Sequence, residues 1–355
     1  QTQGSRKIVH GAIMELKING TPKVAQFAAA VALTQNYHHG EASLENSIYC
    51  RMQIYAGGTQ LPIIRPSGLA GTRQWGGDDH GSARYVKVKS NAKLLSLIFP
   101  ADDYQLLPFT LSEGKQYEPD YFVPIIPLAI CESMHLPAHG WKVQLWARDL
   151  LSIVRRVRIC IAGDDVRFIA RPHSGLELPP YEYRNTCNPY TGGIYGDIMH
   201  GKYTIAYGSD RDTVTITELP LRVWTINYLK ALVVRAEKAP HEIYSAVDAS
   251  GDTNRVCLRV ETAPGLFKSI AERANCSEHE AIMHYLRLQT TMTHHINMIG
   301  VNGAVVEFDR YIDVLHNWYP RRRDMYIKRC ERKSVVLGLQ IRMQENIVRY
   351  VTESA

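Results

Sequence analysis

Hydrophobic residues recur with helical spacing near the start of the chain. Between residues 23 and 37 the apolar positions fall three or four residues apart, which predicts a helix with one buried face. A second helix is predicted over residues 44–55, because Gly57 and Gly58 follow it as helix-ending residues. Residues 84–89 then alternate between apolar and polar, which predicts a half-buried strand. Two helices followed by such a strand are typical of a winged-helix unit.

The pattern after residue 150 mixes helices with strands. Two helices and three strands are predicted there, over residues 150–160, 203–207, 213–217, 226–238 and 255–261. Helices and strands that occur in this mixed order indicate an α+β unit.

From Asp309 onward the pattern is helical. Four apolar residues have the heptad-like spacing of a coiled coil: Leu337, Ile341, Val348 and Val351. We therefore expect an α+β fold in three parts, over residues 1–150, 151–305 and 306–355.

The composition narrows the class of protein. The chain has 355 residues, of which 45% are hydrophobic and 21% charged, as in ordinary globular proteins. Its net charge of +6 suits a polyanionic partner. No run approaches the roughly 18 apolar residues of a membrane span, so we expect no membrane partner. The 7 cysteines form no Cys-x-x-Cys pair, which favours a reducing, intracellular compartment over a zinc site.

The candidate chemistry lies in residues 71–85, which hold four glycines and the arginines Arg73 and Arg84. Arginine binds phosphate oxygens with two parallel hydrogen bonds. Tyr85 follows directly, and a neighbouring cation would favour its phenolate, the form that attacks phosphorus. The alternative is a surface loop before an ordinary edge strand with a half-buried tyrosine. These residues alone leave both interpretations open.

Longer blocks carry a family resemblance. The block Tyr-His-His-Gly-Glu at residues 37–41 precedes Gly-Thr-Arg…Arg-Tyr at 71–85, and Phe-Pro-Ala-Asp-Asp follows at 99–103. Pro-Ile-Ile-Pro occupies 124–127, and Ile-Thr-Glu-Leu-Pro occupies 216–220. In this order the blocks resemble the breakage-reunion region of a eukaryotic-type type IIA DNA topoisomerase, over nearly all of the chain. The resemblance implies a winged-helix DNA cleavage domain (1–150), an α/β tower domain (151–305) and the start of a coiled-coil arm (306–355).

The resemblance also implies roles for single residues. Tyr85 matches the catalytic tyrosine and Arg84 its neighbouring arginine, while His39 and His38 match the position that supports the scissile phosphate. Histidines at a helix end can instead act only as capping cations. Basic residues match positions at the start of the domain or would bind flanking phosphates, although a solvent-exposed charge is the default for each alone: Arg6, Lys7, Arg73, Lys87 and Lys89.

One stretch departs from the family. The resemblance implies a glycine-rich loop after residue 127 whose isoleucine wedges between base pairs. Here the matching stretch has lost most of its glycines, and Pro137 stands where the isoleucine should be, next to Leu136. Proline and leucine are both known wedge residues, so we expect DNA bending to persist. The departure favours a divergent member, such as one from a large DNA virus.

For the intact protein, the resemblance implies an ATP-dependent homodimer. Two Tyr85 side chains would form transient 5′-phosphotyrosyl esters so that a second DNA duplex can pass through the break. Neither a Walker-type loop nor an Asp-x-Asp cluster occurs in these residues. Mg²⁺ and ATP are therefore expected to bind through other domains, with no metal or cofactor held here.

The chain begins inside a motif at residues 4–7 and stops within a helical pattern. It is expected to be part of a longer protein and to be inactive alone. The nucleus, or cytoplasmic replication sites for a viral protein, is the expected location. A non-catalytic DNA-binding or architectural protein on the same scaffold is the alternative function.

Overall fold

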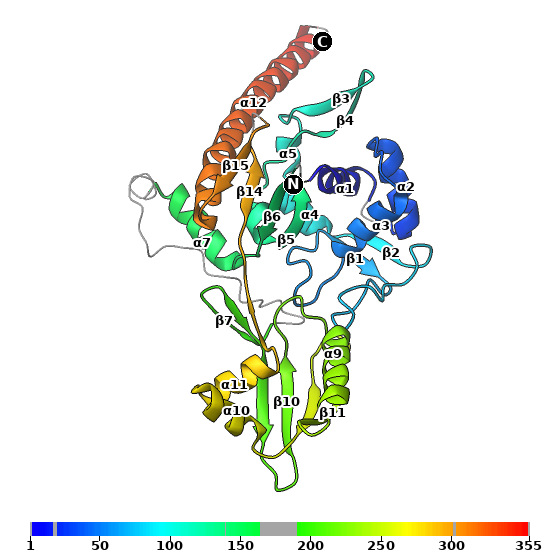
Figure 1. Ribbon diagram of the computed structural model, residues 1–355. Coiled ribbons are helices and arrows are strands. Elements are labelled where there is room, and N and C mark those ends of the chain that lie inside the picture. Colours follow the sequence, from blue (N-terminus) through cyan, green and yellow to red (C-terminus); the bar gives the residue numbers. More distant parts are fainter. Residues whose placement is uncertain (1, 17–19, 139, 164–189, 301–302, 354–355) are drawn as a thin grey trace.

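Three regions follow one another along the length of the molecule. The computed structural model describes residues 2–16, 20–138, 140–163, 190–300 and 303–353; the side chains of 136–138 are outside this description. Figure 1 shows a central body that contains the N-terminus, a tower at one end, and the long helix α12 (Tyr311–Glu353) projecting at the other.

The body begins as a winged-helix unit. Helices α1 (Gln3–Met14), α2 (Val24–Thr34) and α3 (Glu41–Cys50) pack together beside a hairpin of β1 (Ile64–Ser67) and β2 (Lys87–Ser90). The predicted helix pair is present, but the second helix begins earlier and ends earlier than expected. Strand β1, which the sequence pattern did not reveal, is the partner that makes β2 a wing.

The rest of the body consists of short elements on the same core. They are α4 (Ala92–Ile98), α5 (Ala101–Tyr104), β3 (Phe109–Ser112), β4 (Lys115–Pro119), α6 (Leu128–Cys131), β5 (Met134–Ala138), β6 (Trp141–Leu145), α7 (Leu150–Ile161), β14 (Ile296–Ile299) and β15 (Val305–Phe308). Strands β5 and β6 form a hairpin, so the expected loop of residues 132–141 is largely regular. Helix α7 and strand β14 lie within the predicted 151–305 segment, yet their buried residues join the core of the body. The domain boundaries stay a prediction.

The tower is built on a four-stranded antiparallel sheet with a core of its own. Its elements are β7 (Gly193–Tyr195), β8 (Ile198–His200), β9 (Lys202–Ala206), β10 (Asp212–Glu218), α9 (Thr225–Lys238), β11 (Ile243–Asp248), β12 (Leu258–Thr262), α10 (Leu266–Ala274), α11 (Glu278–Tyr285) and β13 (Gln289–Thr291). The sheet order is β11-β12-β10-β9. In β10, Val214 and Ile216 are fully buried whereas Thr213 and Thr215 are not, so one sheet face packs on the helices.

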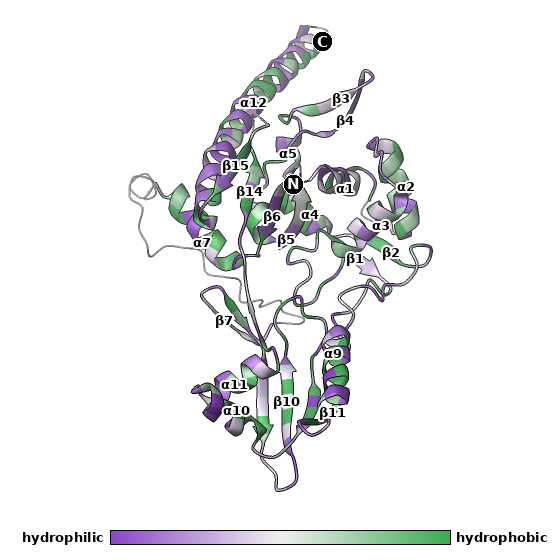
Figure 2. Cartoon of the chain, viewed as in Figure 1, coloured by the Kyte–Doolittle hydropathy of each residue, from purple (hydrophilic) through white to green (hydrophobic). Residues whose placement is uncertain are grey.

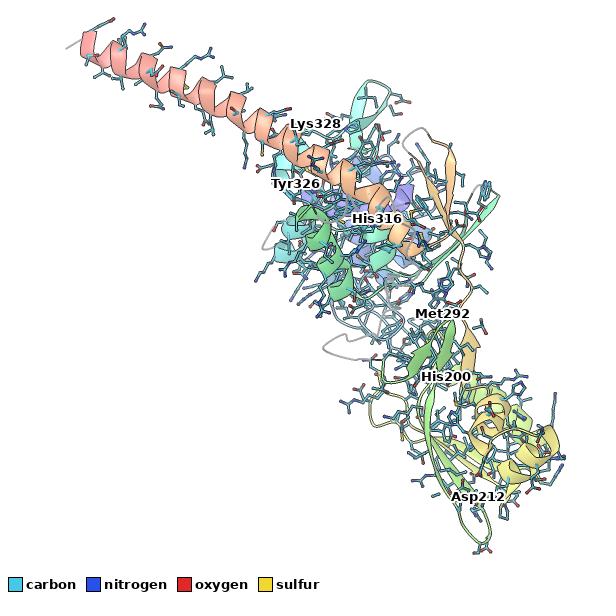
Figure 3. All side chains as sticks on the ribbon, turned by 90° about the vertical axis from the view of Figure 1, so that its left-hand side faces the viewer. His200, Asp212, Met292, His316, Tyr326 and Lys328 are labelled. Carbon is cyan, nitrogen blue, oxygen red and sulfur yellow. The ribbon has the colours of Figure 1, made fainter. Side chains whose placement is uncertain are left out.

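A small apolar cluster joins tower and body at the waist. It combines Ala56, Trp146 and Ala147 of the body with four tower residues: Tyr190, Met199, Leu221 and Met292. Figure 3 shows Met292 at this waist, with His200 just inside the tower. Because both parts contribute buried side chains, their relative placement is fixed by packing.

Helix α12 is anchored at its base and free beyond it. Asp103 of α5 accepts hydrogen bonds from Arg322 at 2.6 Å and from Arg329 at 3.3 Å, and Lys333 lies 2.6 Å from Asp102. The predicted basic run of this helix therefore pairs partly with the acidic pair. Beyond it, apolar residues continue among polar ones toward the C-terminal end (Figure 2), and the residues with heptad spacing are exposed. The long helix agrees with the expected start of a coiled-coil arm.

Candidate active site

Tyr85 lies in a tight turn immediately before strand β2. Its side chain is 73% exposed, and its backbone N–H donates to the oxygen of Ser82 at 2.8 Å. The expected strand over 84–89 thus begins only at Lys87, and Tyr85 is held by a turn. An exposed phenol on a fixed backbone is accessible to a large substrate.

The N-terminus of α2 holds this turn on both sides. Val24 N–H donates to the oxygen of Val86 at 2.9 Å, and Ala25 N–H donates to the oxygen of Ala83 at 3.0 Å. The first N–H groups of a helix have no partner within the helix, so they are available for such contacts. The two bonds flank Arg84 and Tyr85 and fix the position from which both side chains project.

The glycine-rich loop before Tyr85 is closed by contacts with itself. The Asp79 carboxylate accepts from the backbone N–H and the hydroxyl of Thr72, both at 2.7 Å. Gly71 has φ +104°, and a Cβ there would lie 2.5 Å from the oxygen of Gly77. Glycine is therefore required by close backbone packing within the loop, whereas the sequence had favoured close approach to a ligand.

Helix α3 supports the end of the same loop. The Tyr49 hydroxyl donates to the oxygen of Gly81 at 2.7 Å, and its ring stacks on His80 with the centroids 3.9 Å apart. The loop is consequently attached to α3 as well as to α2, and three separate segments determine where Tyr85 lies.

Arg73 does not bind phosphate in this arrangement, which corrects the expectation from sequence. Its side chain is 4% exposed and forms an ion pair with Glu218 at the end of β10. The neighbouring backbone continues the attachment, since Gln74 N–H donates to the oxygen of Thr253 at 3.0 Å and Ile226 N–H donates to the oxygen of Gln74 at 3.1 Å. Arg73 therefore docks the loop on the tower.

Lys7 also differs from its predicted role. It is buried in α1, and its ammonium donates to the Glu118 carboxylate at 2.8 Å and to the oxygen of Gln35. A buried, paired lysine cannot reach a DNA phosphate, so Lys7 joins α1 to β4. Arg6 beside it is half-buried on the same helix.

The wing carries a cluster of exposed cations. Lys87 and Lys89 are exposed on β2 while Val88 between them is buried, as the alternation predicted. Arg65 lies directly opposite Lys89, and Lys23 lies opposite Lys87. Like charges placed opposite each other destabilise a strand pair. In the described part of the chain no carboxylate forms an ion pair with these four side chains, so the wing has the charge distribution of a polyanion-binding surface.

Lys23 and Arg65 were missed in the sequence. Their only signal was a basic side chain on an exposed position, which most surface residues share. Strand register, which the sequence pattern did not supply, is what places them beside Lys87 and Lys89.

The two histidines and the wedge stretch lie at other edges of the winged-helix unit. His38 and His39 are exposed in the segment between α2 and α3, and the Tyr37 ring contacts that of His39 with centroids 5.4 Å apart. In the β5–β6 hairpin, Leu136 pairs with Val143 and Pro137 with Lys142; the side chains of Leu136 and Pro137 are outside the described residues.

His135 at the base of this hairpin is held neutral. Its ring contacts Trp146 with centroids 4.6 Å apart. Burial lowers its pKa to about 4, and the nearby charges of Arg222 and Lys142 act in the same direction.

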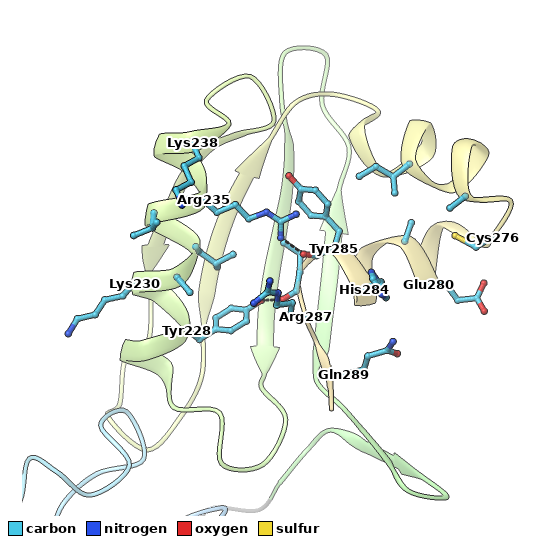
Figure 4. A pocket seen from close by; sticks show the side chains of 17 residues that line it. Tyr228, Lys230, Arg235, Lys238, Cys276, Glu280, His284, Tyr285, Arg287 and Gln289 are labelled. Carbon is cyan, nitrogen blue, oxygen red and sulfur yellow. Dashed lines mark hydrogen bonds between the residues drawn. The ribbon is translucent and has the colours of Figure 1, made fainter. Parts of the chain in front are cut away.

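The largest groove lies on the tower, away from Tyr85. It measures about 1190 Å³ and runs between α9 and α10–α11, where Arg235 and Tyr285 come together (Figure 4). None of the residues around Tyr85 lines it. Among the described residues, no group of three or more His, Cys, Asp or Glu side chains could hold a metal ion. No helix in the described ranges is long and apolar enough to cross a membrane.

Comparison with known proteins places these features in a family. The model of the DNA gyrase/topoisomerase IV family, built on its A-type subunits, matches residues 3–354. DNA topoisomerase 2 of African swine fever virus (isolate Tick/South Africa/Pretoriuskop Pr4/1996) is 35% identical over 100% of this chain and 30% of its own length. DNA topoisomerase 2-alpha of Rattus norvegicus is 28% identical over 93% of this chain and 21% of its own.

A solved structure shares the fold. The DNA-binding, cleavage and re-ligation domain of Plasmodium falciparum topoisomerase II superposes with a TM-score of 0.79, at 23% identity, over 93% of this chain and 42% of that one. The chain thus spans less than a third of the length of the curated relatives.

Proposed function

Because the chain belongs to the DNA gyrase/topoisomerase IV family, as the breakage-reunion domain of a type II topoisomerase, we propose that it cleaves duplex DNA through Tyr85. The Tyr85 oxygen attacks a backbone phosphorus and the bond from phosphorus to the 3′ oxygen breaks. The phenol loses its proton, and the departing 3′ oxygen gains one. The product is a 5′-phosphotyrosyl ester, and the reverse reaction reseals the strand.

The placement of Tyr85 is the observation that carries this proposal. The phenol is 73% exposed on a turn that α2 holds from both sides. Such fixed positioning supplies much of the rate gain in phosphoryl transfer. The Arg84 guanidinium lies 5.8 Å from the Tyr85 ring centre, where it would stabilise negative charge that develops on the phosphate.

The wing surface is the proposed contact to flanking phosphates. Lys23, Arg65, Lys87 and Lys89 would each neutralise backbone charge, which makes affinity steeply dependent on salt. The remaining family roles stay proposals. His39 and His38 would act beside the scissile phosphate, with Arg6 behind them.

Leu136 and Pro137 are the proposed wedge. In the hairpin β5–β6 they would enter between base pairs and bend the duplex, at a cost offset by the additional contacts that a bent duplex makes.

Strand passage belongs to the intact protein. Two copies, each with one Tyr85, would open both strands of one duplex for another to pass, in a cycle coupled to ATP. The family uses Mg²⁺ and ATP. The described residues supply no metal-binding cluster, and we assign no step of the mechanism to a metal.

Tyr85→Phe in the intact protein tests the proposal. The variant should form no covalent adduct with DNA but should keep its affinity within about twofold, since affinity comes from many phosphate contacts. The adduct is trapped by denaturing a cleavage reaction and is located by mass spectrometry. Tyr244→Phe, an exposed tyrosine of the tower, is the control and should cleave normally.

The outcome separates cleavage from simple binding. An adduct on the Phe variant would reject Tyr85 as the nucleophile. A wild-type protein that binds and bends DNA without any adduct would instead identify the non-catalytic architectural protein.

A further inference from the structure

Arg222 occupies a backbone conformation that an arginine rarely adopts. Residues 220–223 form a tight turn in which Val223 N–H donates to the oxygen of Pro220 at 3.0 Å. Arg222 is the third residue of this turn and has φ +68°. That position strongly favours glycine or asparagine, because a Cβ is strained in the left-handed region. A strained residue persists only where the surrounding structure holds it, and such residues cluster at functional sites.

The turn itself is fixed by its neighbours. Pro220 and Leu221 are buried, the latter in the cluster that joins tower and body. Trp224 packs against the 55–58 segment, where a Cβ on Gly57 would lie 3.2 Å from its ring. The Arg222 side chain is exposed, so packing explains the turn but not the choice of arginine in it.

The position of Arg222 connects two elements of the proposed DNA surface. Its backbone nitrogen would lie 3.5 Å from a Cβ on Gly57, which follows α3. Its charge reaches the other side as well: besides burial, the Arg222 guanidinium helps to lower the pKa of His135 in β5. It also opposes the rise that burial causes in the pKa of Cys50 at the end of α3. Arg222 therefore lies between α3 and the β5–β6 hairpin.

The Arg222 guanidinium has no counter-charge among the described residues. In the ranges that the structure describes, no carboxylate forms an ion pair with Arg222 and no acceptor hydrogen-bonds its guanidinium. A guanidinium matches a phosphate with two parallel hydrogen bonds. Strain in the backbone and an unneutralised charge in the side chain thus point to the same kind of ligand.

We propose that Arg222 binds a backbone phosphate of the duplex between α3 and the β5–β6 hairpin, an inference that rests on the proposed function. There it holds the duplex beside the wedge stretch, and the strain of its turn is retained for this contact. Replacing Arg222 by glycine therefore stabilises the fold and weakens DNA binding, a combination that a structural role does not produce.

The chain contains a matched control. Arg287 is also an exposed arginine in the left-handed region, with φ +52°. It follows α11 on the tower and lines the groove shown in Figure 4. Substitution of Arg287 changes the same charge and relieves the same type of strain at a site outside the winged-helix unit.

The experiment compares Arg222→Gly, Arg222→Lys and Arg287→Gly in the 355-residue chain. Fluorescence anisotropy with a labelled duplex of about 30 base pairs, over a range of salt concentrations, gives the affinity and the number of neutralised phosphates. Both glycine variants should melt about 1–3 °C higher than wild type. Arg222→Gly should bind about tenfold more weakly, with a salt slope lower by about one. Arg287→Gly should stay within about twofold of wild type, and Arg222→Lys should fall between.

Two results would overturn the inference. Unchanged binding by Arg222→Gly would show that its charge faces no phosphate, and an equal loss in Arg287→Gly would show that only net charge matters. If the wild-type chain does not bind the duplex, the DNA-binding part of the proposed function is what fails.

Discussion

The buried ion pair between Arg73 and Glu218 gives the sharpest test of how the loop is positioned. Glu218 is 2% exposed and accepts from donors only: the Arg73 guanidinium, Leu219 N–H at 2.9 Å and Thr191 N–H at 3.0 Å. Glu218→Gln would turn an amide NH₂ toward at least one of these donors. It would also leave the Arg73 charge buried without a counter-charge.

The expected cost follows from this burial. Breaking one partner of a buried pair destabilises by about 3–5 kcal/mol, so Glu218→Gln and Arg73→Met should each lose roughly 3 kcal/mol. The double variant removes both charges and should recover about 2 kcal/mol relative to the sum of the single losses. The exposed pair Arg211–Glu261 is the control, with side chains 55% and 25% exposed. Substituting it in the same way should change stability by less than about 1 kcal/mol.

Urea denaturation at constant salt measures these differences, and DNA affinity is measured on the same variants. If Arg73 contacts phosphate, as its sequence position suggested, the double variant will fold but bind DNA more weakly with a reduced salt slope. If Arg73 only docks the loop, the folded double variant binds like wild type. An additive double variant, with no recovered stability, would refute the pair itself.

Two further predictions concern the loop and the hairpin. Gly71→Ala should destabilise by about 1–3 kcal/mol in urea denaturation, because the new Cβ meets the Gly77 backbone at 2.5 Å and φ is +104°; Gly338→Ala in α12, where a Cβ meets nothing within 4 Å, should instead stabilise by about 0.5–1 kcal/mol. His135 has a folded-state pKa of about 4 against an ordinary 6.5, so the unfolded chain binds the extra proton between these values. Stability should therefore fall as pH drops from about 6.5 toward 4, by roughly 1 kcal/mol after allowing for partial exposure. His135→Asn should flatten that part of the urea midpoint against pH, and an unchanged slope would contradict the assignment.

Local pattern predicted most of the elements that carry the fold. The alternation at residues 86–89 placed Val88 inside and Lys87 and Lys89 outside, as observed. The helices predicted over 150–160 and 226–238 agree with α7 and α9 within a residue or two. These predictions succeeded because the burial of one face sets a periodicity that is written along the chain itself.

The errors among the site residues have a shared physical cause. The sequence predicts phosphate contacts for Arg73 and Lys7 because cations are usually exposed. Each is buried instead beside a carboxylate that lies far along the chain, at Glu218 and Glu118. Sequence spacing carries no information on such a partner, since the pairing depends on how the tower and β4 pack against the winged-helix unit.

By itself the sequence determined the family, the winged-helix pattern, the long final helix and the candidate nucleophile Tyr85, because each depends on residues close together in the chain. Only the tertiary structure decided which cations face outward. It placed Lys23 and Arg65 beside Lys87 and Lys89 through strand register. It also used the free N–H groups of α2 to hold the turn around Tyr85. Charge is a property of one residue, whereas access to a ligand depends on everything that packs around it.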